Sequence, residues 1–208
     1  NYSNAKIKSV NTSKIKKYLK QGCITIIAGF QGIDKNERIT TLGRGGSDYS
    51  AIVIAKYLKA IKCIIYTDVI GVMTTDPKIY KRARKIRVIS YEEMLEMSSL
   101  GSKVMQSNSV QDARLNRIDV NVKSSFVKNV GTLITKRKNI IDHKVITGIS
   151  VTKNDAKITI VGVVDRPGVA ASIFKPLSVN NINVDMVVQN ISADGHKTDI
   201  TFTINSKD

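Results

Sequence analysis

The residues best suited to binding chemistry lie in one glycine-rich stretch, residues 40–48, with the sequence TTLGRGGSD. Glycine leaves no Cβ to block a ligand, and the backbone N–H groups at the start of a helix attract anions. Arg44 adds a planar guanidinium that can hold a carboxylate or a phosphate through two hydrogen bonds, and Asp48 adds a carboxylate. A pocket with both signs of charge suits a zwitterion such as an amino acid. The predicted substrate-binding residues are Arg44, Gly45, Gly46, Ser47 and Asp48.

The same stretch has a second interpretation, a tight turn in which Ser47 or Asp48 caps a helix from Tyr49 to Leu58. Such a turn accounts for the glycines, because glycine adopts a positive φ without steric strain. It accounts less well for Arg44 and Asp48, since phosphate binding does not need a carboxylate and a turn needs neither charge.

A second polar pair follows the apolar run from Lys62 to Tyr66, which predicts a buried strand. Thr67 and Asp68 stand where this strand would end, and Gly71 follows. A hydroxyl and a carboxylate at the carboxyl end of a strand can contact ribose, phosphate or a magnesium ion. A plain turn between a strand and a helix is the alternative.

The elements that would position these residues follow an α/β pattern. Cys23 to Ala28 is a continuous apolar run that predicts a buried strand of a parallel sheet, and Gly29 ends it at the edge where ligands bind in open α/β sheets. Ser90 and Glu93 have the spacing of a capping box, and the helix that follows has a methionine-rich face predicted to lie in the core. A further helix is predicted to begin at Ser102, and strands are predicted at 118–124 and 131–134.

The order GRGGSD, preceded by GFQG at residues 29–32, resembles the aspartate kinases. Residues 66–78 are similar to that family's segment YTDVDGVYTADPR, with departures at Ile70, Met73 and Lys78, where aspartate, tyrosine and arginine are usual. The resemblance covers nearly the whole chain. It implies an α/β protein with the amino-acid kinase (carbamate kinase-like) fold, of which residues 1–143 would be the C-terminal, nucleotide-binding part.

The resemblance also implies a reaction, the phosphorylation of L-aspartate by ATP to 4-phospho-L-aspartate, with Mg²⁺ as the ion that accompanies ATP. Arg44 would hold a carboxylate of aspartate, and Asp48 would act as the catalytic residue that holds the amino group. Met73 can cover the adenine without offering a hydroxyl, and Lys78 keeps a positive charge but loses the guanidinium fork, so a weakened nucleotide site is expected. The implied nucleotide-binding residues are Thr67, Asp68, Met73, Lys78 and Lys103.

Residues 144–208 have a different sequence pattern. It predicts a β-α-β-β order with strands at 156–163, 184–191 and 197–204 and a helix at 169–179. This order, with the segments DRPGVAASIF and NINVDMVVQN, resembles most of an ACT domain, a ferredoxin-like module that senses amino acids. The resemblance implies an effector site for lysine or threonine, with a purely structural dimerisation module as the alternative. Its residues would be Asp165, Gly168, Val169, Ala170, Asn183, Val184, Asp185 and Gln189.

Composition limits the other classes of function. The net charge is +16, but residues 1–143 carry 26 basic and 11 acidic residues, whereas residues 144–208 carry 7 and 6, which supports two domains. Aromatic residues make up only 5%, so stacking platforms for bases are scarce and no nucleic-acid partner is expected. No apolar run approaches the roughly 18 residues of a membrane span. Cys23 and Cys63 lie in apolar runs without metal-ligand spacing, which predicts buried thiols of a cytoplasmic protein without a bound structural metal.

Some parts of the resemblance are missing. The family's KFGG-type loop, whose lysine stabilises the transferring phosphoryl group, has no counterpart before Gly22, and the ACT pattern stops short of a final helix and strand. We therefore expect an experimental truncation or the product of a broken or split gene, with little kinase activity of its own. An incomplete ACT sheet is expected to pair with a second module in a homo-oligomer. A non-catalytic regulatory protein that senses lysine or threonine is the alternative function, and nucleic-acid binding through the basic run of residues 81–85 is a third, weaker one.

Overall fold

The computed structural model describes residues 5–102, 104–140, 145–152, 154–191 and 197–207. It divides into two compact units, residues 1–151 and 152–208. The sequence placed this division after His143. The structure places it after Val151 because Thr147 and Ser150 donate hydrogen bonds to the first unit.

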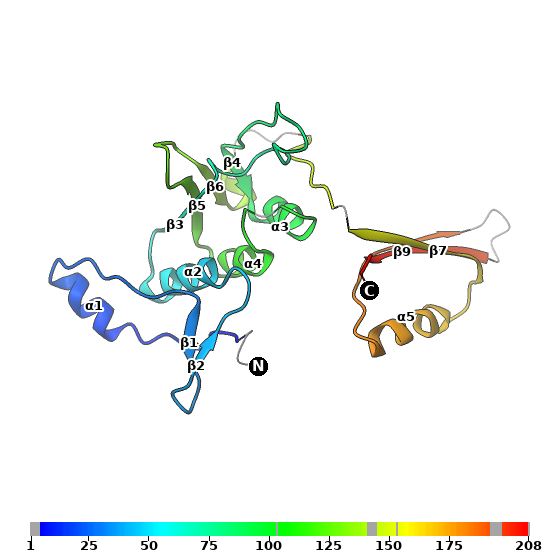
Figure 1. The fold of residues 1–208 in the computed structure, drawn as a ribbon, viewed down its shortest axis with the longest axis horizontal. Coiled ribbons are helices and arrows are strands. Elements are labelled where there is room, and N and C mark those ends of the chain that lie inside the picture. The colour runs from blue at the N-terminus through cyan, green and yellow to red at the C-terminus, as the bar shows by residue number, and fades with distance from the viewer. Residues whose placement is uncertain (1–4, 103, 141–144, 153, 192–196, 208) are drawn as a thin grey trace. The chain divides into compact units, whose positions relative to one another are not determined.

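The first unit contains three short to medium helices around a sheet, a separate hairpin and a basic N-terminal helix (Figure 1). Its elements in chain order are α1 (Ser13–Lys20), β1 (Gln31–Ile33), β2 (Ile39–Thr41), α2 (Gly46–Leu58), β3 (Lys62–Thr67), β4 (Val88–Ser90), α3 (Tyr91–Ser99), α4 (Ser107–Asn116), β5 (Asp119–Ser124), β6 (Thr132–Thr135) and the 3₁₀ turn η1 (Arg137–Asn139).

The main sheet has the strand order β3-β5-β6-β4, with β3 parallel to β5, β4 parallel to β6, and β5 antiparallel to β6. The register places Cys63, Val120 and Ile134 in one row across the sheet, and all three are buried. The next row along β3 belongs to the other face, where Ile64 is 37% exposed. One face of the sheet is therefore packed, and the opposite face is more open to solvent.

Three helices cover the packed face. α2 packs against β3 and α4, and α3 packs against α4, β4 and β6 (Figure 1). The predicted capping box begins α3: Glu93 N–H donates to Ser90 Oγ at 3.2 Å, and Ser90 N–H donates to Glu93 Oε2 at 2.9 Å. Met94 and Met97 lie in the core, as their spacing predicted. α4 begins at Ser107 rather than at the predicted Ser102, because the residues after α3 form a turn before the chain re-enters a helix.

The prediction of a buried strand at 23–28 was wrong. None of the strands in the described ranges pairs with this run, and Ile24 and Ile26 are 93% and 97% exposed. Cys23 is exposed as well, against the prediction, whereas Cys63 is buried as predicted. Ile27 and Ala28 line a cavity of about 860 Å³ together with residues 5–10 and the hairpin of β1 and β2. An apolar run becomes a strand only where neighbouring strands accept its backbone hydrogen bonds.

The second unit confirms the predicted β-α-β-β order: β7 (Asp155–Val164), α5 (Val169–Val179), β8 (Val184–Ile191) and β9 (Lys197–Asn205). The strands form an antiparallel sheet in the order β7-β9-β8. Ile200 and Phe202 of β9 are buried, and the rings of Phe174 and Phe202 meet edge to face at 5.3 Å between centroids. Helix α5 thus closes one face of this sheet through aromatic packing. None of the helices in the described ranges is long and apolar enough to cross a membrane.

Candidate functional site

The glycine-rich stretch forms a loop that leads directly into α2. Gly45 has a left-handed backbone (φ 72°) at the N-cap, and α2 begins at Gly46. The prediction that Ser47 or Asp48 caps this helix was wrong: both residues lie in its first turn, and no side chain in this described segment caps it. Arg44 and Ser47 are exposed and Asp48 is half-buried. The N–H groups of the first turn are therefore left without a side-chain partner beside an exposed guanidinium.

Ser50 joins this loop to the turn that follows residues 23–28. Its Oγ accepts a hydrogen bond from Phe30 N–H at 3.0 Å and donates one to the carbonyl oxygen of Gly46 at 2.7 Å. Leu42 N–H also donates to the carbonyl oxygen of Phe30 at 3.0 Å. Phe30 is held at φ 68°, a conformation that is uncommon for a residue with a side chain. The GFQG and GRGGSD segments therefore form one connected structure.

The side chains of Leu42, Phe30 and Gln106 occupy the space that the glycines leave open. A Cβ on Gly46 would lie 2.9 Å from Cδ2 of Phe30, and a Cβ on Gly45 would lie 2.0 Å from Cγ of Gln106. Gln106 comes from the N-cap of α4, far along the chain. Sequence reasoning missed Gln106 as a neighbour of the loop, because no spacing in the sequence links the two. These glycines are needed for close packing as well as for backbone conformation.

The electrostatic state of Asp48 sets it apart from an ordinary surface carboxylate. Burial raises the pKa of Asp48 above its usual value. Among the described residues, neither ion pair involves Asp48, although the chain is strongly basic. A carboxylate that is partly buried without a cation is ready to accept a hydrogen bond from an ammonium group.

Four of the five predicted nucleotide-binding residues lie at the end of β3 or on the long connection between β3 and β4. Thr67 ends β3, its Oγ1 donates to Asp68 Oδ1 at 3.0 Å, and its carbonyl oxygen accepts from Ser125 N–H at 2.8 Å. Met73 is half-buried and forms an isolated bridge with Lys85. Lys78 is exposed, and its N–H donates to Asp76 Oδ1 at 2.8 Å. The structure thus brings Thr67 and Asp68 together, while Lys103 lies outside the described residues.

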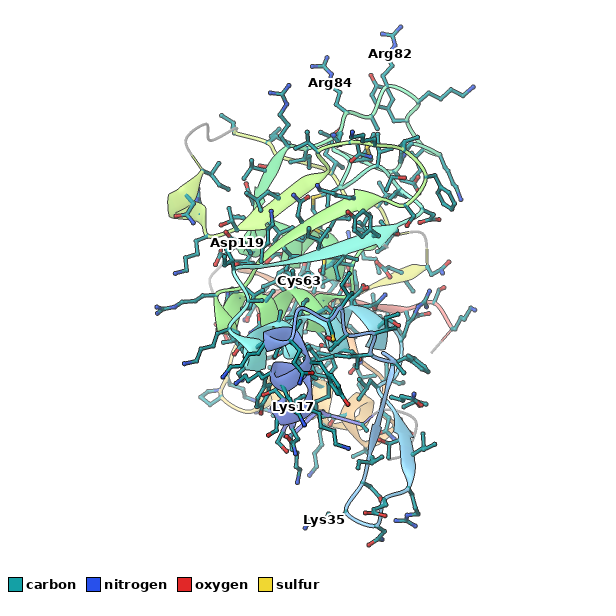
Figure 2. The ribbon with its side chains drawn as sticks, turned by 90° about the vertical axis from the view of Figure 1, so that its left-hand side faces the viewer. Lys17, Lys35, Cys63, Arg82, Arg84 and Asp119 are labelled. Carbon is teal, nitrogen blue, oxygen red and sulfur yellow. The ribbon has the colours of Figure 1, made fainter. Side chains whose placement is uncertain are left out.

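The same connection contains the basic run of residues 81–85. Thr74 N–H donates to the carbonyl oxygen of Arg84 at 2.8 Å, and Arg84 N–H donates to Thr74 Oγ1 at 3.0 Å. Figure 2 shows the Arg82 and Arg84 side chains extending outward at the end of the first unit opposite to Lys35. These cations are directed into solvent, where they can attract an anion such as a polyphosphate.

The donor set tests whether a magnesium ion fits. No group of three or more potential metal-binding side chains occurs among the described residues. The exposed carboxylate of Asp68 with the neighbouring Thr67 hydroxyl supplies two oxygen donors at the carboxyl end of β3. Mg²⁺ is commonly bound by one or two carboxylates together with the phosphates of a nucleotide. These residues therefore fit an ion that arrives with its nucleotide.

The structure separates the predicted effector residues into two groups. Gly168 (φ 93°) is the N-cap of α5, and Val169 and Ala170 form its first turn. Asn183 and Val184 instead line a cavity of about 580 Å³ beside the later turns of α5, with Phe174, Leu177, Ser178, Asn181, Ile182 and Val187. Gln189 Nε2 donates to Thr198 Oγ1 at 3.4 Å, while Asp165 and Asp185 are exposed.

Comparisons with known proteins agree with this architecture. The model of the amino acid kinase family matches residues 2–124, and an ACT domain model matches residues 158–208. The aspartate kinase of Pseudomonas putida is 48% identical over 204 residues, covering 98% of this chain and 49% of that protein.

Two solved structures of E. coli aspartokinase III are similar in fold. Its complex with aspartate and ADP matches with a TM-score of 0.69 and 31% identity, covering 85% of this chain and 38% of that one. Its complex with lysine and aspartate matches with a TM-score of 0.67 and 31% identity, covering 86% and 39%. The chain spans about half the length of the curated relatives it matches. The predicted α/β fold with a following ACT domain is confirmed, and the chain belongs to the amino acid kinase family as a relative of the aspartate kinases.

Proposed function

We propose that this chain provides the aspartate-binding and nucleotide-binding residues of an aspartate kinase, which transfers the γ-phosphoryl group of ATP to the side-chain carboxylate of L-aspartate. One observation carries the proposal: the exposed Arg44 and the half-buried Asp48, which forms no ion pair with another described residue, flank a glycine loop at the N-terminus of α2. That arrangement offers a cation, an anion and the uncapped start of a helix within a few residues, which is what a zwitterionic substrate requires.

Arg44 holds a carboxylate of aspartate through its guanidinium fork, and Asp48 accepts a hydrogen bond from the α-ammonium group. The bound ammonium group offsets the burial that raises the pKa of Asp48. Gly45, Gly46 and Ser47 shape the loop, and Phe30 and Gln106 hold it by packing against the glycines. Phosphoryl transfer depends mainly on such positioning and on neutralisation of charge.

The connection between β3 and β4 holds the nucleotide. Asp68 and Thr67 supply oxygen donors for the accompanying Mg²⁺, Met73 covers the adenine, and the exposed Lys78 approaches the phosphates together with Lys103. Magnesium bound with ATP neutralises phosphate charge and so favours transfer. Lysine in place of a guanidinium at residue 78 gives a point charge without bidentate geometry.

The second unit regulates this activity by binding lysine or threonine, the end products of the amino-acid biosynthesis that aspartate phosphorylation begins. Support comes from the ACT match and from the E. coli relative solved with lysine and aspartate. The two groups of effector residues form one site when two ACT modules of a cytoplasmic homo-oligomer pair. Asp165 and Asp185 then contact the ammonium group, and the N–H groups of Gly168, Val169 and Ala170 contact the carboxylate.

Titration calorimetry of the chain with L-aspartate and with Mg-ADP tests the proposal. Arg44→Lys keeps the charge but loses the fork, and the affinity for aspartate should fall by about 1.5–3 kcal/mol, or roughly 10- to 150-fold, with the affinity for Mg-ADP unchanged. Arg38→Lys is the matched control, because Arg38 bonds to Asp34 in the hairpin turn. Equal losses for both ligands, or an equal effect of the control, would remove the role assigned to Arg44.

A further inference from the structure

A short segment at the C-terminal end of the first unit is fastened to the rest of that unit by hydrogen bonds. We call residues 147–150 the strap. Thr147 Oγ1 donates to Glu93 Oε1 at 2.5 Å, Ile149 N–H donates to the carbonyl oxygen of Thr74 at 2.7 Å, and Ser150 Oγ donates to the carbonyl oxygen of Met97 at 3.2 Å. The strap therefore touches α3 and the β3–β4 connection at the same time.

Polar contacts, not apolar burial, hold the strap. The large apolar side chains around it are exposed: Val145, Ile146 and Ile149 are 102%, 69% and 61% exposed. Glu93 is the anchor, since one carboxylate oxygen accepts from Thr147 and the other from Ser90. A segment that is fastened mainly by a few hydrogen bonds opens at a low free-energy cost compared with a core element.

Gly148 allows the strap to lie this close. A Cβ at this position would lie 2.9 Å from Sδ and Cε of Met97 and 3.1 Å from the carbonyl oxygen of Thr74. Methionine can move aside, but the Thr74 carbonyl oxygen belongs to the backbone. A side chain on residue 148 would thus push either the strap or Thr74 out of place.

Thr74 links the strap to the nucleotide-binding connection. It follows Met73 and precedes Asp76, and its own N–H and Oγ1 bond to the backbone of Arg84. The strap bonds both to the carbonyl oxygen of Thr74 and to α3. It therefore fixes the bonded Thr74–Arg84 pair relative to α3.

We propose that the strap is a positioning element for the nucleotide-binding connection: by holding the Thr74 carbonyl oxygen against α3, it sets the geometry of the residues that contact the nucleotide. This inference rests on the proposed nucleotide function of Thr67, Asp68, Met73 and Lys78. The strap is continuous with the second unit, where Thr152 Oγ1 donates to Asp155 Oδ2 at the start of β7. That bond lies within the second unit and does not involve residues 147–150.

Backbone amide exchange in the whole chain, measured by NMR, tests whether the strap positions Thr74, without relying on catalysis. Thr147→Val removes the bond to Glu93, and exchange at the Ile149 amide should rise about tenfold, with a comparable rise at the Thr74 and Arg84 amides. Gly148→Ala should give the same pattern with a larger increase. Thr152→Val is the matched control, because its hydroxyl bonds to Asp155 in the second unit, and it should leave these three amides unchanged.

The second measurement is the dissociation constant for Mg-ADP, which should rise about three- to tenfold in Thr147→Val and stay constant in Thr152→Val. An exchange increase confined to Ile149 would overturn the proposal, because the strap would then be docked without positioning Thr74. An increase at all three amides with an unchanged dissociation constant would overturn it as well. Failure of the unaltered chain to bind Mg-ADP would instead refute the proposed function, and the exchange measurements would still decide whether the strap holds Thr74.

Discussion

Two apolar runs of similar composition adopt different structures in the first unit. Residues 23–28, with the sequence CITIIA, are largely exposed and pair with none of the described strands. Residues 62–67, with the sequence KCIIYT, form β3, whose Cys63 and Ile65 are 7% and 8% exposed. Hydrophobicity and β-branching are alike in the two runs, so they do not explain the difference.

The partner strand explains it. β3 lies parallel to β5 over its full length, and α2 packs on its buried face. The strand β5 is more than fifty residues away in the chain, and nothing in the local sequence of residues 62–67 indicates it. A continuous apolar run predicts that a strand is possible, whereas the backbone of another segment decides whether it forms.

The hairpin of β1 and β2 is a third, intermediate case. Its strands have only three residues each, and Ile33 and Ile39 are 72% and 70% exposed, yet they pair. The partner here is supplied by the next few residues of the chain. A local turn can thus replace the burial that β3 obtains from the sheet and helices.

The largest expected difference between the two runs is in stability. Ile65→Ala removes buried methyl groups and should lower the free energy of unfolding of the first unit by about 2–5 kcal/mol. Ile26→Ala, at a side chain that is 97% exposed, should change it by less than about 0.5 kcal/mol. Urea unfolding followed by tyrosine fluorescence reports the first unit, because all seven tyrosines lie within residues 1–151. A comparable loss in Ile26→Ala would show that residues 23–28 are packed in solution.

The next largest expected effect is a difference in reactivity between the two cysteines. Burial first, and the nearby charge of Asp48 second, raise the pKa of Cys63 to about 11, whereas Cys23 is exposed. Since the thiolate is the reactive form, iodoacetamide at pH 8 should modify Cys23 at least about 100-fold faster than Cys63. Peptide mass spectrometry over time distinguishes the two sites, with urea-unfolded protein as the control in which the rates converge. Equal rates in the native chain would contradict the burial of β3.

Local signals predicted much of this fold correctly. The capping box at Ser90 and Glu93 and the whole β-α-β-β order of the second unit depend on residues a few positions apart. The predictions that were wrong depend on segments far away in the chain or on backbone geometry. Residues 23–28 need a strand that no neighbouring sequence provides. Helix α2 has Gly45, with a left-handed backbone, as its N-cap, and Gln106 of a distant segment packs where a Cβ of Gly45 would be.

The candidate site shows the same difference between local sequence signals and contacts of distant segments. The residue types of the glycine loop, Arg44 and Asp48 above all, suggest a zwitterion from sequence alone. The bonds of Ser50 to Phe30 and Gly46, and the contact of Ile149 with Thr74, have no sequence signature, since each depends on how separate segments pack. The residue types that suggest a binding chemistry can be read from the sequence, whereas the contacts that position them cannot.

A smaller effect connects the site to β3. The raised pKa of Asp48 means that its charged form is less stable in the folded state, so Asp48 reduces stability as the pH rises through its folded pKa and contributes nothing when both states are protonated. Asp48→Asn should therefore stabilise the first unit at pH 7. This gain should shrink as the pH falls through the raised folded pKa and be absent below about 3.8, and the substitution should also speed alkylation of Cys63 modestly. Urea unfolding at several pH values measures the gain. A loss of stability at pH 7 would mean that Asp48 makes a favourable native contact.

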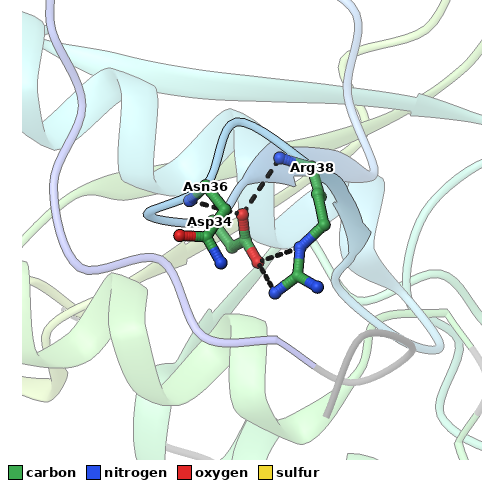
Figure 3. A network of polar contacts seen from close by, with 3 residues as sticks. All are labelled: Asp34, Asn36 and Arg38. Carbon is green, nitrogen blue, oxygen red and sulfur yellow. Dashed lines mark hydrogen bonds and ion pairs between the residues drawn. The ribbon is translucent and has the colours of Figure 1, made fainter.

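The smallest expected effect is in the turn of the β1–β2 hairpin. Hydrogen bonds to Asp34 stabilise this turn, whereas β1 and β2 have no further described strand beside them. Asp34 Oδ1 accepts hydrogen bonds from the N–H groups of Asn36 and Arg38, and Oδ2 accepts from Nε and Nη2 of Arg38 (Figure 3). The backbone bond from Arg38 is the main cause of a lowered pKa, which only partial burial opposes, and the side-chain bond and charge of Arg38 lower it further. The carboxylate therefore supports the turn above about pH 3.8, and this support is lost as the pH falls through the lowered folded pKa.

Asp34→Ala should consequently unpair β1 from β2 and raise amide exchange at Ile33 and Ile39, while β3 keeps its protection. Lys35→Ala in the same turn is the control, because Lys35 is exposed and takes no part in these bonds. If the hairpin opens in Asp34→Ala, β1 and β2 become exposed in the way that residues 23–28 already are, which would show that a partner supplied by the turn is what separates the two. If it stays paired, packing against residues 5–10 holds it, and the bond from Ala5 N–H to the carbonyl oxygen of Thr41 becomes the contact to remove next.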